Sequence, residues 1–176
     1  GRLNVTSAFD ANLIASPDYA IFDLSPFVKS QTVKIDLNTI DRSKLDPKID
    51  IEFSNSTVKF EHWINGSSLF VKAELLEQKI GQHQGNIVIF DRVKQHIPIL
   101  LRISDGAIGV SENNGNLNFK IDSQRDWSYA KISVYNEDFK LVSSVSATPA
   151  KLESIKVSSP GKYWVQAELK SGKDTI

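Results

Sequence analysis

The stretch Gly81–Gly106, GQHQGNIVIFDRVKQHIPILLRISDG, predicts two β-strands that form a hairpin, followed by a short exit. Ile87 and Ile89 occupy alternate positions before the expected turn. After the turn the alternation continues at Ile97, Ile99, Leu101 and Ile103. An apolar residue at every second position is typical of a strand that buries one face. Spacing and turn residues differ on the two sides of this stretch, so we expect it to close one β unit and lead into a second.

The chain before the hairpin repeats this alternation in short segments separated by turn residues. Ser16-Pro17-Asp18 is typical of a break before a first strand, and Asn65-Gly66 of a tight hairpin turn. We expect strands at Tyr19–Leu24, Gln31–Leu37, Ile49–Phe53, Val58–Ile64 and Leu69–Leu75. With the hairpin this makes about seven strands, the number and spacing of an immunoglobulin-like or fibronectin-III-like β-sandwich over residues 15–104.

The polar turn Ser104-Asp105-Gly106 follows a complete set of strands, and we place a domain boundary there. Beyond it we expect strands at Ala107–Ser111, Leu117–Ile121, Ala130–Val134, Phe139–Val145, Leu152–Val157 and Tyr163–Leu169. They predict a second β-sandwich over residues 105–176, either compact or truncated. The predicted fold class is therefore all-β, with two tandem immunoglobulin/fibronectin-III-like sandwiches.

Residues 1–14 follow a different pattern. Apolar residues between Leu3 and Leu13 lie at roughly helical spacing, and Asn4 or Thr6 is suited to cap a helix start. A single terminal helix beside an all-β chain predicts a short helix remnant that belongs to an upstream neighbour.

Composition excludes some partners and favours one location. The 21 Lys and Arg balance the 21 Asp and Glu without long blocks of either sign, which argues against nucleic acid as a partner. No apolar run approaches the roughly 20 residues of a membrane-spanning helix. The chain has no Cys, which leaves the compartment open. Candidate N-glycosylation sites at Asn4, Asn55 and Asn65 favour secretion.

The three histidines do not predict a metal site. With a turn near Val93, Phe90 is expected opposite His96 and His83 near Ile103, which separates His83 from His96 by about 20 Å. His62 lies on the apolar face of its predicted strand, where we expect a hydrogen-bonded structural histidine.

No arrangement of nucleophiles or carboxylates predicts catalysis, and no cofactor is expected. Gly-x-Ser-x-Gly and Gly-Thr-Ser are absent from the sequence. Of the clustered carboxylates at Asp41, Asp46, Asp50 and Glu52, the last two should project outward from a solvated strand face. The loops Glu112–Asn116 and Asn136–Asp138 offer oxygens to calcium without a recognised ligand spacing. Trp63, Trp127 or Tyr135 are suited to stack on a sugar ring, although cross-strand packing explains single aromatics equally well.

Two segments together resemble a known family. In Gly1–Leu13, Gly1, Leu3, Asn4 and Ala8 fill a Gly-x-[Leu/Val/Ile]-Asn-x-x-x-Ala pattern. This pattern resembles the last helix of a subtilisin-like serine protease catalytic domain. Further on, Gly81-x-x-x-Gly85-Asn86-Ile87-Val88-Ile89 leads to Ile97-Pro98-Ile99. That stretch resembles the end of the fibronectin-III-like domain that follows the catalytic domain in many secreted subtilases. The resemblance covers about residues 1–104.

The resemblance implies that the catalytic Asp, His and Ser lie upstream, so no catalytic residue is carried over. It implies a non-catalytic, extracellular accessory region that contacts and stabilises the upstream protease domain, with substrate positioning or spacing from a cell surface as further roles. Two other interpretations stay open. One is a cell-surface adhesion or glycan-binding module, and the other is a structural surface-layer or pilus component.

Overall fold

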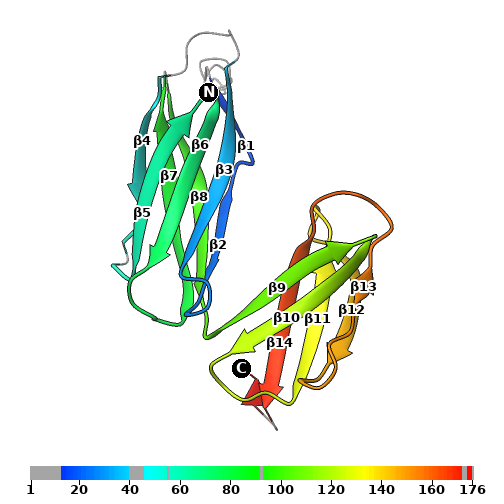
Figure 1. Cartoon of the computed structure of the whole chain (residues 1–176). Coiled ribbons are helices and arrows are strands. Elements are labelled where there is room, and N and C mark those ends of the chain that lie inside the picture. Colours follow the sequence, from blue (N-terminus) through cyan, green and yellow to red (C-terminus); the bar gives the residue numbers. More distant parts are fainter. Residues whose placement is uncertain (1–12, 40–45, 55, 92, 172–173, 176) are drawn as a thin grey trace, which may run out of the picture. The chain divides into compact units, whose positions relative to one another are not determined.

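The computed structural model describes residues 13–39, 46–54, 56–91, 93–171 and 174–175, and within them the secondary structure is all β. The chain divides into two compact units, Gly1–Ser104 and Asp105–Ile176, here called unit 1 and unit 2 (Figure 1). The strands of unit 1 are β1 (Leu13–Ser16), β2 (Ala20–Leu24), β3 (Ser30–Thr39), β4 (Lys48–Glu52), β5 (Val58–Asn65), β6 (Ser68–Leu75), β7 (Gly81–Phe90) and β8 (Lys94–Ile103). Those of unit 2 are β9 (Gly106–Asn113), β10 (Asn116–Ser123), β11 (Tyr129–Tyr135), β12 (Leu141–Ala147), β13 (Ile155–Lys156), β14 (Trp164–Ser171) and β15 (Asp174–Thr175).

Unit 1 is a β-sandwich of two four-stranded sheets. One sheet has the order β1-β3-β6-β5, and the other has the order β2-β8-β7-β4. The apolar positions that alternate along the hairpin point into the core, and Ile87, Ile89 and Leu101 are fully buried. Burial of this one face is what selects the strand register. The prediction of an all-β chain built from immunoglobulin/fibronectin-III-like sandwiches is confirmed.

The register of the central hairpin differs from the prediction by two residues. Phe90 pairs with Lys94, whereas His96 lies opposite Val88. The turn is three residues long and includes a hydrogen bond from the Asp91 amide to the Val93 carbonyl. Because the side-chain period of a strand is two, a shift of two residues leaves every side chain on its expected face.

The turn between β5 and β6 lies one residue later than predicted. Asn65 pairs with Ser68, so Gly66 and Ser67 form the turn. Gly66 has a φ of 63°, which a residue without a Cβ adopts at little cost at the first central position of a tight hairpin turn.

The first strand of unit 1 is divided between the two sheets. β1 pairs antiparallel with β3, and β2 pairs parallel with β8 after the break at Ser16-Pro17. The helix expected over residues 1–14 lies mostly outside the described residues, and its last residues, Leu13 and Ile14, belong instead to β1.

Unit 2 is a second sandwich, with sheets in the order β13-β10-β9 and β12-β11-β14-β15. Its core is smaller and centres on the fully buried Ala130, Ile132 and Val134 of β11. The stripe Tyr163, Val165, Ala167 and Leu169 packs against this core as predicted. Phe139 was expected at a strand start, but it lies in the turn before β12 with a φ of 59°.

Candidate binding surfaces

The described residues do not bring together a metal centre. Among them, no group of three or more His, Asp or Glu is placed to hold an ion. His62 is exposed, although its place on the apolar face of the strand predicted a structural role in the interior. It lies near the far end of β5, an edge strand whose burial ends at Phe60. The pattern predicted the correct face of the strand, but the opposite sheet of unit 1 does not cover that face at His62.

The carboxylates and the candidate calcium loops have structural explanations. Asp50 and Glu52 are exposed, whereas Ile49 and Ile51, which alternate with them, are half-buried, as predicted. Asp46 is exposed, and Asp41 lies outside the described residues.

In the two loops, side-chain oxygens accept hydrogen bonds from the turns themselves. Glu112 Oε1 accepts from the Gly115 amide at 2.7 Å. Asn136 Oδ1 accepts from the amides of Asp138 and Lys140 at 2.9 and 3.0 Å. These oxygens therefore stabilise loop backbone rather than converge on a cation.

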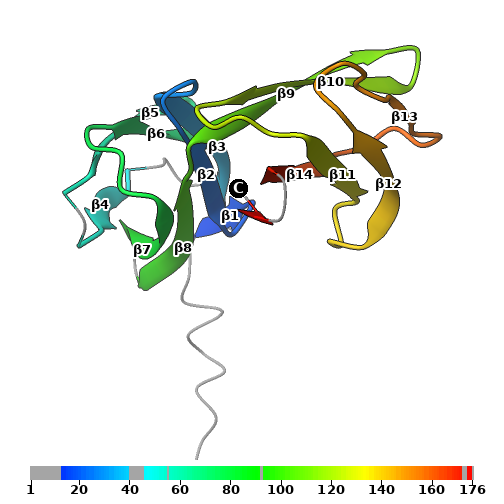
Figure 2. The same cartoon turned by 90° about the horizontal axis from the view of Figure 1, so that it is seen from below.

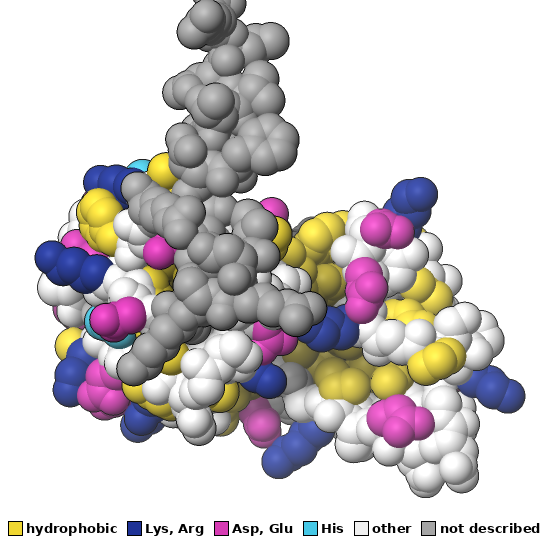
Figure 3. Space-filling view, turned by 90° about the horizontal axis from the view of Figure 1, so that it is seen from above, with side chains coloured by type: hydrophobic (Ala, Val, Ile, Leu, Met, Phe, Trp, Pro, Cys, Tyr) yellow, Lys and Arg dark blue, Asp and Glu magenta, His cyan; other side chains and the backbone are white. Residues whose placement is uncertain are grey.

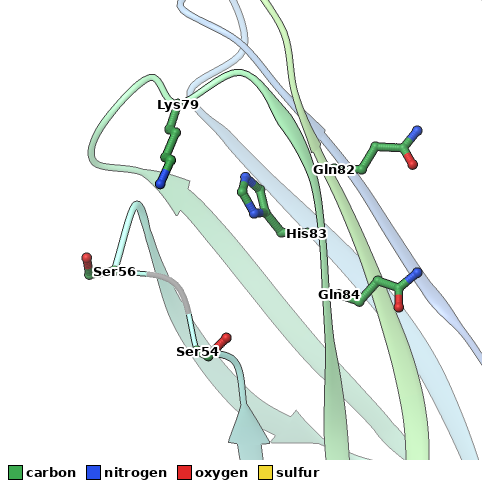
Figure 4. A pocket seen from close by; sticks show the side chains of 6 residues that line it. All are labelled: Ser54, Ser56, Lys79, Gln82, His83 and Gln84. Atoms are coloured by element: carbon green, nitrogen blue, oxygen red, sulfur yellow. The ribbon is translucent and has the colours of Figure 1, made fainter.

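One surface pocket of about 660 Å³ lies at the end of unit 1, lined by Ser54, Ser56, Lys79, Gln82, His83 and Gln84. Lys79 and His83 point into the space beside the Ser54–Ser56 loop, whereas Gln82 and Gln84 point away from it (Figure 4). The His83 ring also packs edge-on against Phe53, with 6.5 Å between centroids. The pocket combines hydroxyl, amine and imidazole groups, which suits a small polar ligand more than an apolar one.

One exposed aromatic platform lies on the outer face of the β1-β3-β6-β5 sheet. Trp63 and Phe70 are cross-strand partners whose rings stack, 5.7 Å apart and 10° from parallel. Trp63 keeps 44% of its surface exposed. Lys34 pairs with Phe70 on the opposite side of β6, so a cation and an aromatic pair share one row of the sheet. An aromatic face beside a polar group suits a ligand with both apolar and hydrogen-bonding surface, such as a sugar ring.

The sequence pattern indicated Trp63 but not Phe70. The signal was present, because Leu69-Phe70-Val71 places an apolar residue at the outward position of an alternating strand. For the other two candidates the structure favours the packing alternative. Trp127 is half-buried and packs on the core of unit 2, which makes it a structural residue. Tyr135 is half-buried and pairs with Trp164, on which the Phe139 ring stacks at 5.7 Å.

The structure describes one of the three candidate glycosylation positions. Asn65 is exposed beside the Gly66 turn, where a glycan has room. Asn4 and Asn55 lie outside the described residues, although Thr57, the third residue of the Asn55 sequon, is 3% exposed.

Among the described residues, the charged groups indicate no further binding site. Burial raises the pKa of Asp23, and Arg102, its cross-strand partner, opposes that effect. On the face of the molecule in Figure 3, basic and acidic side chains are interspersed over the described parts of both units. No helix long and apolar enough to span a membrane occurs in the described parts of the chain.

Comparison with known proteins adds little to this description. No family model matches the chain, and no curated protein matches it. A chaperone–tip adhesion subunit pre-assembly complex from archaic Csu pili of Acinetobacter baumannii is similar at 10% identity, over 94% of this chain and 96% of that chain, with a TM-score of 0.37. An I-band fragment of titin is similar at 8% identity, over 94% and 63%, with a TM-score of 0.39. Domains 5–6 of the S-layer protein SbsC are similar at 10% identity, over 94% of each chain, with a TM-score of 0.35. At these values the similarities carry no information on function.

Proposed function

We propose that the chain is a non-catalytic accessory region of an extracellular subtilisin-like serine protease, formed by two β-sandwiches that follow the catalytic domain and stabilise it. The observation that carries this proposal is the pattern at the two ends of residues 1–104, GRLN with Ala8 and then Gly81-x-x-x-Gly85-Asn86 leading to Ile97-Pro98-Ile99. On this proposal the catalytic residues lie upstream, and unit 1 contacts the protease domain.

The structure gives the second pattern a physical reason. Gly85 lies on β7 opposite Ile99, beside the end of β4. A Cβ at Gly85 would lie 2.5 Å from the Glu52 carbonyl oxygen and 2.6 Å from the Phe53 ring. Glycine at this position therefore permits the backbone at the end of β4 to lie close to β7. The glycine of the pattern is thus explained by packing within a β-sandwich.

The test compares the chain with its longer parent. We expect the protein that includes the sequence before Gly1 to contain a Gly-Thr-Ser nucleophile and to react with a fluorophosphonate probe, whereas the pure chain does not react. Deletion of residues 15–176 should lower the melting temperature of the catalytic domain. Labelling of the pure chain would refute the proposal, and so would an upstream sequence without a serine nucleophile.

The Trp63–Phe70 platform favours a second candidate, a glycan-binding surface module. On a glycan array, selective binding that is lost in Trp63→Ala and kept in Phe27→Ala would support it. Phe27 is a matched control, because it is an aromatic residue of unit 1 with 46% of its surface exposed. Absence of selective binding by the unmodified chain would exclude this candidate.

A further inference from the structure

The N-glycosylation triplet Asn65-Gly66-Ser67 lies at the turn that joins β5 to β6. All three of its residues are exposed, whereas Thr57, the third residue of the Asn55 triplet, is 3% exposed. An Asn-x-Ser triplet accepts a glycan where x is not proline and where the position is accessible. The triplet at Asn65 lies entirely within the described residues and meets both conditions.

Asn65 and Trp63 project from the same face of the sheet that contains β3, β6 and β5. This sheet forms one layer of unit 1, opposite the layer that contains β7 and β8 (Figure 2). The two residues are two positions apart on β5, so their side chains point to the same side and their Cα atoms are about 7 Å apart. Their partners on β6 are Ser68 and Phe70. Leu69, between these partners, points into the core and has no exposed surface, so the shared face is the outer one.

Polar groups lie on the same outer face, beside the Trp63–Phe70 platform. On β3, Lys34 is paired with Phe70 and Asp36 with Ser68. The Ser68 hydroxyl donates to Asp36 Oδ1 at 2.9 Å, and Lys34 Nζ lies 3.6 Å from the same oxygen. The side chains of Lys34 and Asp36 are 58% and 54% exposed, so both can still bind groups outside the chain.

The first sugar of a glycan on Asn65 therefore starts next to two stacked rings and a row of polar groups. The C–H groups of a pyranose ring form an apolar face that packs on an aromatic side chain, and its hydroxyl groups need donors and acceptors. Trp63, with 44% of its surface exposed, offers the apolar contact. Ser68 and Asp36 lie in the same row of the sheet as Asn65 and offer the polar contacts.

We propose that Asn65 carries an N-linked glycan whose first sugar packs on the Trp63–Phe70 platform and directs its hydroxyl groups toward Ser68 and Asp36. The occupant of the platform is then part of the same chain, and the platform is not a site for glycans in solution. This inference goes beyond the proposed accessory function and rests on it only for the extracellular location.

The test uses the chain with Asn4→Gln and Asn55→Gln, secreted by a host that transfers a high-mannose N-glycan. Endoglycosidase H then leaves one N-acetylglucosamine on Asn65. The folded protein is labelled with hydroxyl radicals and digested with trypsin, and mass spectrometry compares peptide 60–72 with and without the sugar in one sample. The sugar should slow the oxidation of Trp63 at least about twofold, because it covers the indole, and should leave that of Trp164 unchanged.

A matched pair of variants separates stacking from a general effect of the glycan. Relative to Asn65→Gln, the sugar should raise the melting temperature of unit 1, measured by calorimetry, by roughly 2–4 °C. Trp63→Ala should abolish this rise. Ile64→Ala should keep it, because Ile64 is next to Asn65 in the sequence and 39% exposed but points to the opposite face of β5. Circular dichroism checks that the variants fold.

Three results would each overturn the proposal: an unmodified Asn65, equal oxidation of Trp63 with and without the sugar, and a rise in melting temperature that Trp63→Ala retains. Selective binding of glycans in solution by the sugar-bearing chain would also overturn it, because the platform would then be free. These outcomes are independent of the protease assignment, which the fluorophosphonate probe and the upstream sequence test separately.

Discussion

Arg125 Nε lies 2.6 Å from Oδ2 of Asp105, the first residue of unit 2. The Asp105 side chain is 12% exposed, and its backbone carbonyl accepts a hydrogen bond from the Gln124 amide. The pair therefore joins the start of β9 to the segment that follows β10. We expect Arg125→Ala to lower the free energy of unfolding of unit 2 by about 1 kcal/mol, because it leaves a poorly solvated carboxylate without its cation.

Chemical denaturation checks this value, with Lys120→Ala as the control. Lys120 lies 4.0 Å from Asp122 and its side chain is 79% exposed, so its loss should change stability by less than about 0.5 kcal/mol. Equal effects of the two substitutions would contradict a specific role for Arg125.

Gly85→Ala should destabilise unit 1 by about 2 kcal/mol or more, because the new Cβ would overlap backbone and ring atoms of Glu52 and Phe53. Gly109→Ala is the control, since its Cβ would make contacts of 3.7 Å that are ordinary. Thermal unfolding of both variants measures the difference. A Gly85→Ala variant as stable as the unmodified chain would show that β4 and β7 separate easily.

Phe22→Ala should cost about 3–5 kcal/mol in unit 1, since Phe22 has no exposed surface and packs edge-on against Phe60 at 5.8 Å. Phe27→Ala, at an aromatic with 46% of its surface exposed, should cost less than about 1 kcal/mol. Urea unfolding followed by hydrogen exchange in residues 87–103 reports on this unit. Similar midpoints for both variants would argue against the core assigned to unit 1.

Asn136→Ala should lower the stability of unit 2 by about 1 kcal/mol, because its side-chain oxygen accepts hydrogen bonds from two amides of the turn before β12. Asn118→Ala, at an exposed position of β10, is the control. Hydrogen exchange in residues 136–140 should accelerate in the first variant alone; unchanged exchange there would mean that the turn is held by other contacts.

Alternation predicted which face each strand buries, but not how far the opposite layer extends. Ile97 and Ile103 are buried as expected, because every second residue of β8 from Ile97 onward is apolar and lies between the sheets. His62 follows the same pattern and is exposed, since cover along an edge strand depends on loops and strand lengths elsewhere in the chain.

Turn positions were harder to predict for a different reason. The β7–β8 turn contains neither Gly nor Asn, so no residue type in the sequence indicated how long the turn is. The predicted pairing of Phe90 with His96 was therefore wrong. Of the aromatic platform, only Trp63 was predicted. Phe70 can be recognised as its partner only from the pairing of β5 with β6, which places the two side chains side by side.

The parallel pairing of β2 with β8 has a mechanical consequence. Five consecutive residues, Ala20 to Leu24, lie opposite Ile99 to Ile103. In a parallel pair, the beginning of one strand and the end of the other lie at opposite ends of the ladder. Tension that enters unit 1 ahead of Ala20 and leaves it after Ile103 would therefore load this ladder in shear, so that its hydrogen bonds resist together instead of opening one after another. A module with this arrangement transmits pulling force between whatever is joined to its two ends.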